Sequence, residues 1–316
     1  MTSTADSTDR QALLKRALLE IKDLRTKLER LEKLDRARSE PIAIIGMGCR
    51  FPGGANNPEA LWRLLREGAE VSSEVPKDRW DIDAHYDPDP NAPMKTYSRR
   101  GSFVDQIDLF DPQFFGVSPR EALSMDPQQR LFLEVGWEAL EDAGQAPDKL
   151  AGTRTGVFAA SGNEEYGYRL ERVGHTDAHT ATGNIPGFLP GRLSFLLGLN
   201  GPSISLHTTC SSSLVALHLA CQSLRMKECD MALTGGGSLM LSPFGHIALC
   251  KIGMMARDGR SKSFDATGDG YGRGEGIGVI VLKRLSDALE NGDRIRALIR
   301  GTAANQDGSS SGVAVP

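Results

Sequence analysis

The chain has 316 residues, which is long enough for one large or two ordinary domains with a substantial core. Hydrophobic residues make up 40% of it and charged residues 25%, the balance of an ordinary soluble globular protein. The net charge of −4 offers no electrostatic reason to expect nucleic acid, and no apolar run reaches the roughly 18 residues of a membrane-spanning helix.

Cysteine usage and the N-terminus both bear on the cellular compartment. The five cysteines are odd in number and lack paired C-x-x-C spacing, which argues against a disulfide framework or a zinc site. The first residues are polar and charged rather than those of a signal peptide. We therefore expect a cytoplasmic protein without a membrane or nucleic-acid partner.

Residues 10–38 form a segment of their own, free of Gly and Pro and rich in helix formers. Apolar residues repeat every seven positions along two rows, Leu14, Ile21 and Leu28 in one and Ala17, Leu24 and Leu31 in the other. This seam predicts a protruding coiled-coil helix over residues 1–39, the alternative being one amphipathic helix packed on its own domain. Ten Lys/Arg against five Asp/Glu also suggest an acidic partner helix.

From residue 40 onward, strand and helix patterns alternate. The long helix predicted for 126–144 ends at a glycine, and an irregular Asp- and Pro-rich stretch covers about 76–98. The alternation predicts an α/β protein with a buried sheet. The expected strands cover 42–45, 153–161, 201–206, 231–240, 276–285 and 294–305, and a further helix covers 61–68.

Cys210 stands between one of these strands and the next helix. Ile204 and Leu206 alternate with polar residues before it, and the apolar spacing after it is helical, which predicts an interior helix. The serines at 211–213 are expected to supply an N-cap and a polar first turn. A helix N-terminus favours the thiolate of a cysteine placed beside it. We therefore interpret Cys210 as a nucleophile rather than as an inert buried thiol.

Two glycine-rich motifs suggest other sites. Gly46, Gly48 and Phe51 occupy the places of a dinucleotide-binding fingerprint, but the third glycine is absent and no helix opens at once. The glycines of 269–278 precede a strand, which is the wrong order for a phosphate loop, so a tight turn near a substrate channel is the better interpretation. Four carboxylates that could form an acid/base set are more simply caps and turn residues: Asp126, Asp265, Asp269 and Glu275.

The six histidines offer Cys210 no convincing base. His218 lies eight residues into the helix, about 12 Å along its axis. His207 is three residues before Cys210, and an odd separation in a strand places two side chains on opposite faces. The remaining histidines are unsupported by any pattern: His85, His175, His179 and His246.

The motif "TTCSSSLVALHLA" around Cys210 resembles the nucleophile motif of β-ketoacyl synthases, specifically the ketosynthase domains of modular type I polyketide synthases. The resemblance covers 41–316 and includes "PIAIIGMGCRFPGG", "SRRGSFVDQIDLFDPQFFGVSPREALSMDPQQRLFLEVGWEALEDAG", "TGNIPGFLPGRLSFLLGLNGPS", "DGRSKSFDATGDGYGRGEG" and "NQDGSSSG". Residues 1–39 resemble the N-terminal docking helices of such synthases.

The resemblance implies an α/β, thiolase-like fold of α-β-α-β-α layers over residues 40–316, working as a homodimer. It also implies that Cys210 takes an acyl chain from the phosphopantetheine thiol of an upstream acyl carrier protein. A malonyl-type extender would then lose carbon dioxide and attack the acyl-cysteine, with the Cys210 backbone N–H holding the oxyanion. No cofactor bound by the domain itself is implied. The implied partners are the acyl and malonyl-type thioesters and the C-terminal docking helix of the upstream synthase.

Two departures from the family pattern stand out. His207-Thr208-Thr209 replaces the usual Asp-Thr-Ala before the cysteine, which concerns substrate preference or local packing. The family's histidine motifs, E-A-H-G-T-G-T and N-x-G-H, are absent. We therefore expect a ketosynthase fragment with an incomplete second half, the alternative being a docking or scaffold protein that cannot condense.

Overall fold

The computed structural model describes residues 15–16, 20–28, 39–162, 165–309 and 311. Residues 20–28 are helical, and their apolar side chains at Ile21, Leu24 and Leu28 are exposed. An ion pair between Lys27 and Asp23 joins successive turns. The other seam residues, Leu14, Ala17 and Leu31, lie outside the described residues, so the coiled coil stays a prediction.

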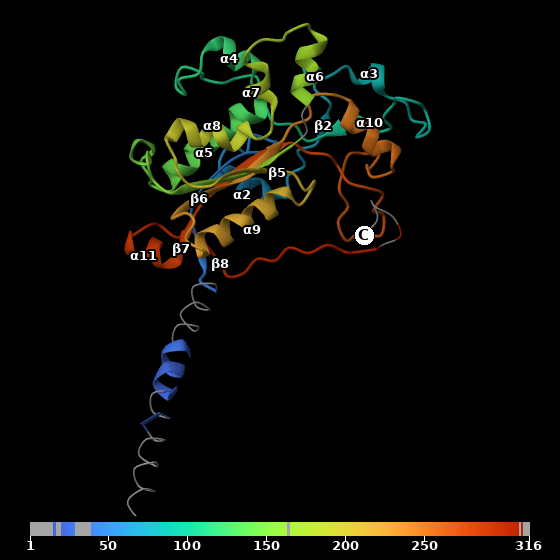
Figure 1. The fold of residues 1–316 in the computed structure, drawn as a ribbon. Coiled ribbons are helices and arrows are strands. Elements are labelled where there is room, and N and C mark those ends of the chain that lie inside the picture. The colour runs from blue at the N-terminus through green and yellow to red at the C-terminus, as the bar shows by residue number, and fades with distance from the viewer. Residues whose placement is uncertain (1–14, 17–19, 29–38, 163–164, 310, 312–316) are drawn as a thin grey trace, which may run out of the picture.

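A six-stranded mixed sheet forms the centre of the fold (Figure 1). Strands β4 and β5 run parallel, as do β4 and β6, whereas β7 is antiparallel to both β6 and β1, and β8 is antiparallel to β1. The buried sheet predicted from the sequence is therefore confirmed. In spatial order its strands are β5 (Ser203–Leu206), β4 (Thr155–Ser161), β6 (Met231–Ser238), β7 (Gly276–Arg284), β1 (Ile42–Arg50) and β8 (Ala297–Ile299).

Helices cover both faces of this sheet. Helices α5 (Pro127–Asp142) and α8 (Phe188–Leu197) pack on one face, and α9 (Ser212–Arg225) packs on the other (Figure 1). Alternation along β4 divides the core accordingly, because Val157 joins the cluster of α5 and α8 while Phe158 joins that of α9. The described residues thus supply three of the layers that the resemblance implies.

The remaining elements surround this core. They are β2 (Ser73–Glu74), β3 (Arg100–Gly101), α2 (Pro58–Glu67), α3 (Ile82–His85), α4 (Pro119–Ser124), η1 (Pro147–Lys149), α6 (Glu165–Arg172), α7 (Thr180–Asn184), α10 (Phe244–Lys251) and α11 (Leu285–Glu290). The predicted helix at 61–68 is α2, which Asn57 caps at the start and the left-handed Gly68 ends. In the part of the chain described, no helix has the length and apolar content needed to cross a membrane.

Strand β1 is longer than the sequence predicted, because it continues through both glycines to Arg50. A Cβ at Gly46 would lie 2.4 Å from the carbonyl oxygen of Ala139, and one at Gly48 would lie 2.7 Å from that of Val135. These glycines therefore let α5 lie directly against the strand. Since they belong to a strand covered by a helix, they form no phosphate-binding loop.

The prediction of an interior helix after Cys210 is only half right. Ala216, Ala220 and Leu224 of α9 are fully buried against the sheet. Leu214, by contrast, is 69% exposed on the outer face. The sequence of α9 has apolar residues on two faces of the helix. Among the described residues, the sheet covers only one of these faces.

Candidate active site

Cys210 lies at a sharp turn between β5 and α9, where the sequence predicted it. Its thiol is free and its side chain is exposed. Thr209, directly before it, has a φ of 53°, in the left-handed region that β-branched residues avoid. Such a conformation costs on the order of 1–3 kcal/mol and persists only where its surroundings enforce it. The backbone is thus forced to present residue 210 outward from the end of the sheet.

Hydroxyl groups hold this turn in place. Ser212 Oγ donates to the carbonyl of Thr209 at 2.6 Å and accepts from the Thr208 N–H at 2.8 Å. Ser211 Oγ donates to the carbonyl of Thr208 at 2.8 Å. The serines therefore brace the turn behind the cysteine.

The capping role predicted for the serines is wrong in one respect. Ser211 does occupy the N-cap position of α9, but its side chain accepts no hydrogen bond from the helix. Its hydroxyl faces back to Thr208 because the turn before the helix is tight. The first turn of α9 therefore lacks the usual side-chain cap of its N–H groups, which point toward the end of the helix where Cys210 lies.

The other four cysteines differ from Cys210 in being buried. Burial raises the pKa of the Cys49 thiol to about 11, and does the same for Cys221. Burial also raises the pKa of Cys229. Cys250 lies 3.1 Å from Thr96 Oγ1 in the interior. Among the five cysteines, exposure and position thus single out Cys210 as the candidate nucleophile.

In the described part of the chain, no hydrogen bond joins Cys210 to a histidine. His218 Nδ1 lies 2.7 Å from Thr302 Oγ1. His246 is fully buried, and burial together with Arg273 lowers its pKa to about 4. His207 is exposed. That no histidine of this chain serves Cys210 as a base therefore stays a prediction.

Tyr271 is a candidate site residue that the sequence did not single out. Burial raises the pKa of its phenol, the charge of Arg273 opposes this, and the charge of a Cys210 thiolate adds to the rise. Gly270, on one side of Tyr271, has a φ of 136° and passes close to the backbone of Met255. The glycine-rich stretch, expected to form a tight turn near a substrate channel, thus carries a partly exposed aromatic ring. Its alternation of Gly with Tyr and Arg was the signal.

The four carboxylates weighed as an acid/base set are structural. Glu275 accepts from two backbone N–H groups and pairs with the buried Arg79. The other three also serve caps, turns or ion pairs: Asp126 accepts from the Gln128 N–H, Asp265 from the Thr267 N–H, and Asp269 pairs with Lys262. No acid/base pair forms among them.

A small cavity of about 20 Å³ lies at the end of β4, the strand that runs parallel beside β5. Parallel strands end at the same edge of a sheet, so this cavity and the Cys210 turn share one edge. Ser161 and Asn184 line it with polar atoms that have no hydrogen-bond partner among the described residues, together with Asp126, whose pKa burial raises to about 6. The edge thus combines an exposed thiol with a polar recess.

Residues 39–288 match the family model described as "Beta-ketoacyl synthase, N-terminal domain". One of the phenolphthiocerol/phthiocerol polyketide synthase proteins of Mycobacterium tuberculosis is 53% identical over 320 residues, covering 99% of this chain and 14% of the relative. Another protein of the same synthase is 51% identical over 281 residues, covering 89% of this chain and 18% of the relative. The chain therefore spans less than a fifth of these relatives.

Solved structures agree with the family match. The oxazolomycin ketosynthase domain OzmH KS7 of Streptomyces albus superposes with a TM-score of 0.83 at 42% identity, covering 88% of this chain and 48% of that one. The ketosynthase from module 6 of the bacillaene synthase of Bacillus subtilis gives 0.81 at 41% identity, covering 88% and 46%. The predicted thiolase-like fold is confirmed, and the chain belongs to the β-ketoacyl synthase family, among the ketosynthase domains of polyketide synthases.

Proposed function

We propose that this chain is the nucleophile-bearing part of a polyketide synthase ketosynthase and that Cys210 carries the acyl chain. The Cys210 thiolate attacks the carbonyl of a thioester held on the phosphopantetheine arm of an upstream acyl carrier protein. The tetrahedral oxyanion lies by the uncapped N-terminus of α9 and the Cys210 N–H. The carrier thiolate then leaves and takes up a proton, and the acyl group stays on the Cys210 sulfur.

In the complete ketosynthase, condensation follows. A malonyl-type extender loses carbon dioxide, the resulting enolate carbon attacks the acyl-cysteine carbonyl, and the Cys210 thiolate departs as the carbon–carbon bond forms. The family resemblance assigns enolate stabilisation to two histidines whose motifs do not occur in this chain. Acylation is therefore the step that the described residues support directly.

The observation that carries this proposal is an exposed, free thiol directly after a left-handed threonine at the mouth of a packed helix. A nucleophile on a strained strand-to-helix turn is held clear of its own backbone and close to helical N–H groups. Those features serve attack on a carbonyl, and a structural cysteine has no need of them.

Acyl transfer to Cys210 is tested with a small acyl thioester and intact-protein mass spectrometry. The chain should gain one acyl group, which peptide mapping should place on Cys210. The Cys210→Ala variant should gain none, while the Ser203→Ala variant, changed at an exposed position on the same strand, should behave as the unaltered chain. Acylation of Cys210→Ala at the original rate would overturn the proposal.

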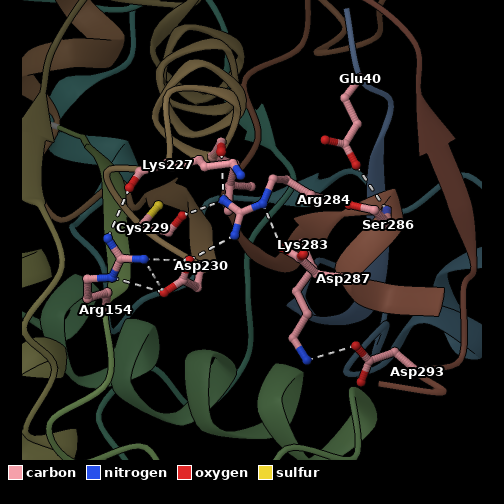
Figure 2. Close-up of polar contacts among 11 residues, drawn as sticks. Glu40, Arg154, Lys227, Cys229, Asp230, Lys283, Arg284, Ser286, Asp287 and Asp293 are labelled. Carbon is pink, nitrogen blue, oxygen red and sulfur yellow. Dashed lines mark hydrogen bonds and ion pairs between the residues drawn. The ribbon is translucent and has the colours of Figure 1, made fainter. Parts of the chain in front are cut away.

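We further propose that residues 1–39 dock an upstream synthase and that the ketosynthase domain begins at residue 40. The Glu40 carboxylate accepts from the Ser286 N–H at 3.0 Å, which anchors the start of the domain (Figure 2). Arg225, in the last turn of α9, donates to the Glu40 carbonyl at 3.0 Å. Deleting 1–38 should slow acylation from the cognate upstream carrier but not from a small thioester. Equal loss of both reactions would assign the segment to the fold.

The exposed edge of the sheet supports a homodimer. Strand β5 lies at one end of the sheet, and Phe195, Ile204 and Leu214 on and beside it are exposed. A second copy of β5 would satisfy this edge and cover these side chains. Ile204→Asp should shift the sedimenting species from dimer to monomer, whereas Leu298→Asp on the opposite edge strand β8 should not. A monomeric unaltered chain would exclude the proposal.

We place the protein in the cytoplasm, with its substrates carried on the arms of acyl carrier proteins rather than on a cofactor of its own. The five cysteines are all free, as a reducing compartment allows. In vitro, the exposed Cys210 thiol should need reductant to stay active. Full acylation capacity after prolonged storage in oxidising buffer would count against this assignment.

A further inference from the structure

One face of α5 points away from the sheet and is acidic. Glu134, Trp137, Glu138 and Glu141 stand at helical spacings of three and four, which places them along a single stripe. Opposite residues of the same helix, such as Val135 and Ala139, are fully buried against β1. The stripe therefore lies on the side of the helix away from the sheet, where Glu141 is exposed and Glu134, Trp137 and Glu138 are half-buried.

Phe114 adds an exposed ring to this stripe. Its ring packs edge-on against that of Trp137, with centroids 4.9 Å apart and planes at 79°. Trp137 is half-buried on the main core, and its indole N–H donates to Glu141 Oε1 at 2.9 Å. Phe114, in contrast, is 56% exposed. The two rings form a fixed aromatic ledge, since one of them rests on the core.

The charges around this ledge are unbalanced. Glu138 is paired with Arg50. Asp111, Glu134 and Glu141 have no ion-pair partner among the described residues. Burial raises the pKa of Glu134, the positive charge of Arg50 opposes this rise, and the neighbouring Glu138 and Asp111 add to it. We call Asp111, Phe114, Glu134, Trp137 and Glu141 the acidic aromatic patch. It presents two rings beside three carboxylates that form no ion pair among the described residues.

We propose that the acidic aromatic patch binds an arginine-bearing segment of a partner polypeptide. A guanidinium can lie over the Trp137 ring while its N–H groups reach the carboxylates of Glu134 or Glu141. An apolar side chain of the same segment would cover Phe114. Charge complementarity selects a basic partner and excludes a nucleic acid or an acidic helix at this place. This surface is separate from the Cys210 turn, so the proposal stands apart from the proposed function.

Binding can be followed through Trp137 itself. The chain has three tryptophans: Trp62, which is exposed, Trp80, which is buried, and Trp137. Replacing Trp62 with Phe in the full chain leaves Trp137 as the tryptophan that reports on surface contacts. The probe is an eight-residue peptide of alternating arginine and leucine pairs, compared with the same peptide carrying glutamate in place of arginine. Arginine peptide should change the emission saturably, and added salt should weaken it.

Variants separate the patch from general stickiness. The double change Glu134→Gln and Glu141→Gln should weaken binding about tenfold, because it removes two charges and keeps the side-chain shape. The matched control, Glu59→Gln and Glu67→Gln on α2, changes two carboxylates of another helix with an exposed apolar face and should leave affinity unchanged. Phe114→Ala should also weaken binding, with the melting temperature measured alongside. Equal binding of the glutamate peptide, or an effect of the α2 control as large as that of the patch variant, would overturn the proposal.

Discussion

Helix α9 meets very different surroundings at its two ends. At the N-terminal end the chain passes through a left-handed threonine and presents an exposed thiol. At the C-terminal end Arg284 donates to the carbonyl of Leu224 in the last turn and to that of Cys229 just beyond the helix (Figure 2). Arg284 also pairs with Asp230, which Arg154 contacts from the other side.

The difference shows how one helix can serve both stability and reaction. The C-terminal end is anchored, because a buried guanidinium binds the Leu224 carbonyl in its last turn. The N-terminal end accepts strain and keeps its first N–H groups free of a side-chain cap. The anchored end holds the helix, and the uncapped end is available for an oxyanion.

The largest expected contrast concerns thiol reactivity. Brief iodoacetamide treatment at pH 8 should label Cys210 far faster than the four buried cysteines. A thiol with a pKa of about 11, as at Cys49 and Cys221, is only about 0.1% thiolate at that pH, and burial also blocks access. Peptide mass mapping against time measures each site. If any buried cysteine were labelled faster than Cys210, the N-terminal end of α9 would not be a special site of thiol reactivity.

Removing the contacts of Arg284 at the C-terminal end of α9 should lower the stability of the fold and leave the acylation rate unchanged. Arg284→Ala leaves two carbonyls and Asp230 without their buried donor, so we expect about 3–5 kcal/mol of destabilisation. Arg154→Ala, whose side chain is mostly exposed, should cost less than about 1 kcal/mol. Chemical denaturation measures both. The acylation rate per folded molecule should not change, and a large fall would show that the two ends are coupled.

The stability of the fold should also depend on pH through Asp126, which lies at the sheet edge that bears Cys210. Burial raises the pKa of this carboxyl from an ordinary 3.8 to about 6, so the folded state binds its proton more tightly than the unfolded state does. The contribution to stability is complete below about 3.8 and is lost as the pH rises through 6. Asp126→Asn keeps the cap and should stabilise the fold by about 2 kcal/mol above pH 7 but not at pH 4. Equal gains at both pH values in thermal denaturation would contradict this origin.

The smallest effect should come from loosening the turn itself. Ser212→Ala removes two hydrogen bonds that hold residues 208 and 209, which should cost about 1–2 kcal/mol. Acylation should slow, because Thr209 is then freer to leave its strained conformation. Ser213→Ala, an exposed position one residue further along, is the control. An unchanged acylation rate in Ser212→Ala would mean that the strain does not position the thiol.

Local patterns allowed much of this molecule to be predicted. The position of Cys210 followed from alternation before it and helical spacing after it, and both periodicities report local backbone geometry. The role of Gly46 and Gly48 did not follow, because it depends on α5 lying against β1 from far along the chain. Tyr271 was missed for the same reason, since its electrostatic interaction with Cys210 arises only in the folded chain. The exposed face of α9 could not be foreseen either, because periodicity shows which face can be buried and not what covers it.

The anchoring of Glu40 has a mechanical consequence. The residue leads directly into β1, whose first residue, Ile42, pairs with Arg284 of β7 on one side and Ile299 of β8 on the other. A force that pulls on the N-terminal segment along β1 would have to break the hydrogen bonds to β7 and to β8 at the same time, because both strands hold β1 against sliding. The segment before residue 40 is thus tethered to a strand held on both sides, so it can transmit a pull without peeling the sheet open from its edge.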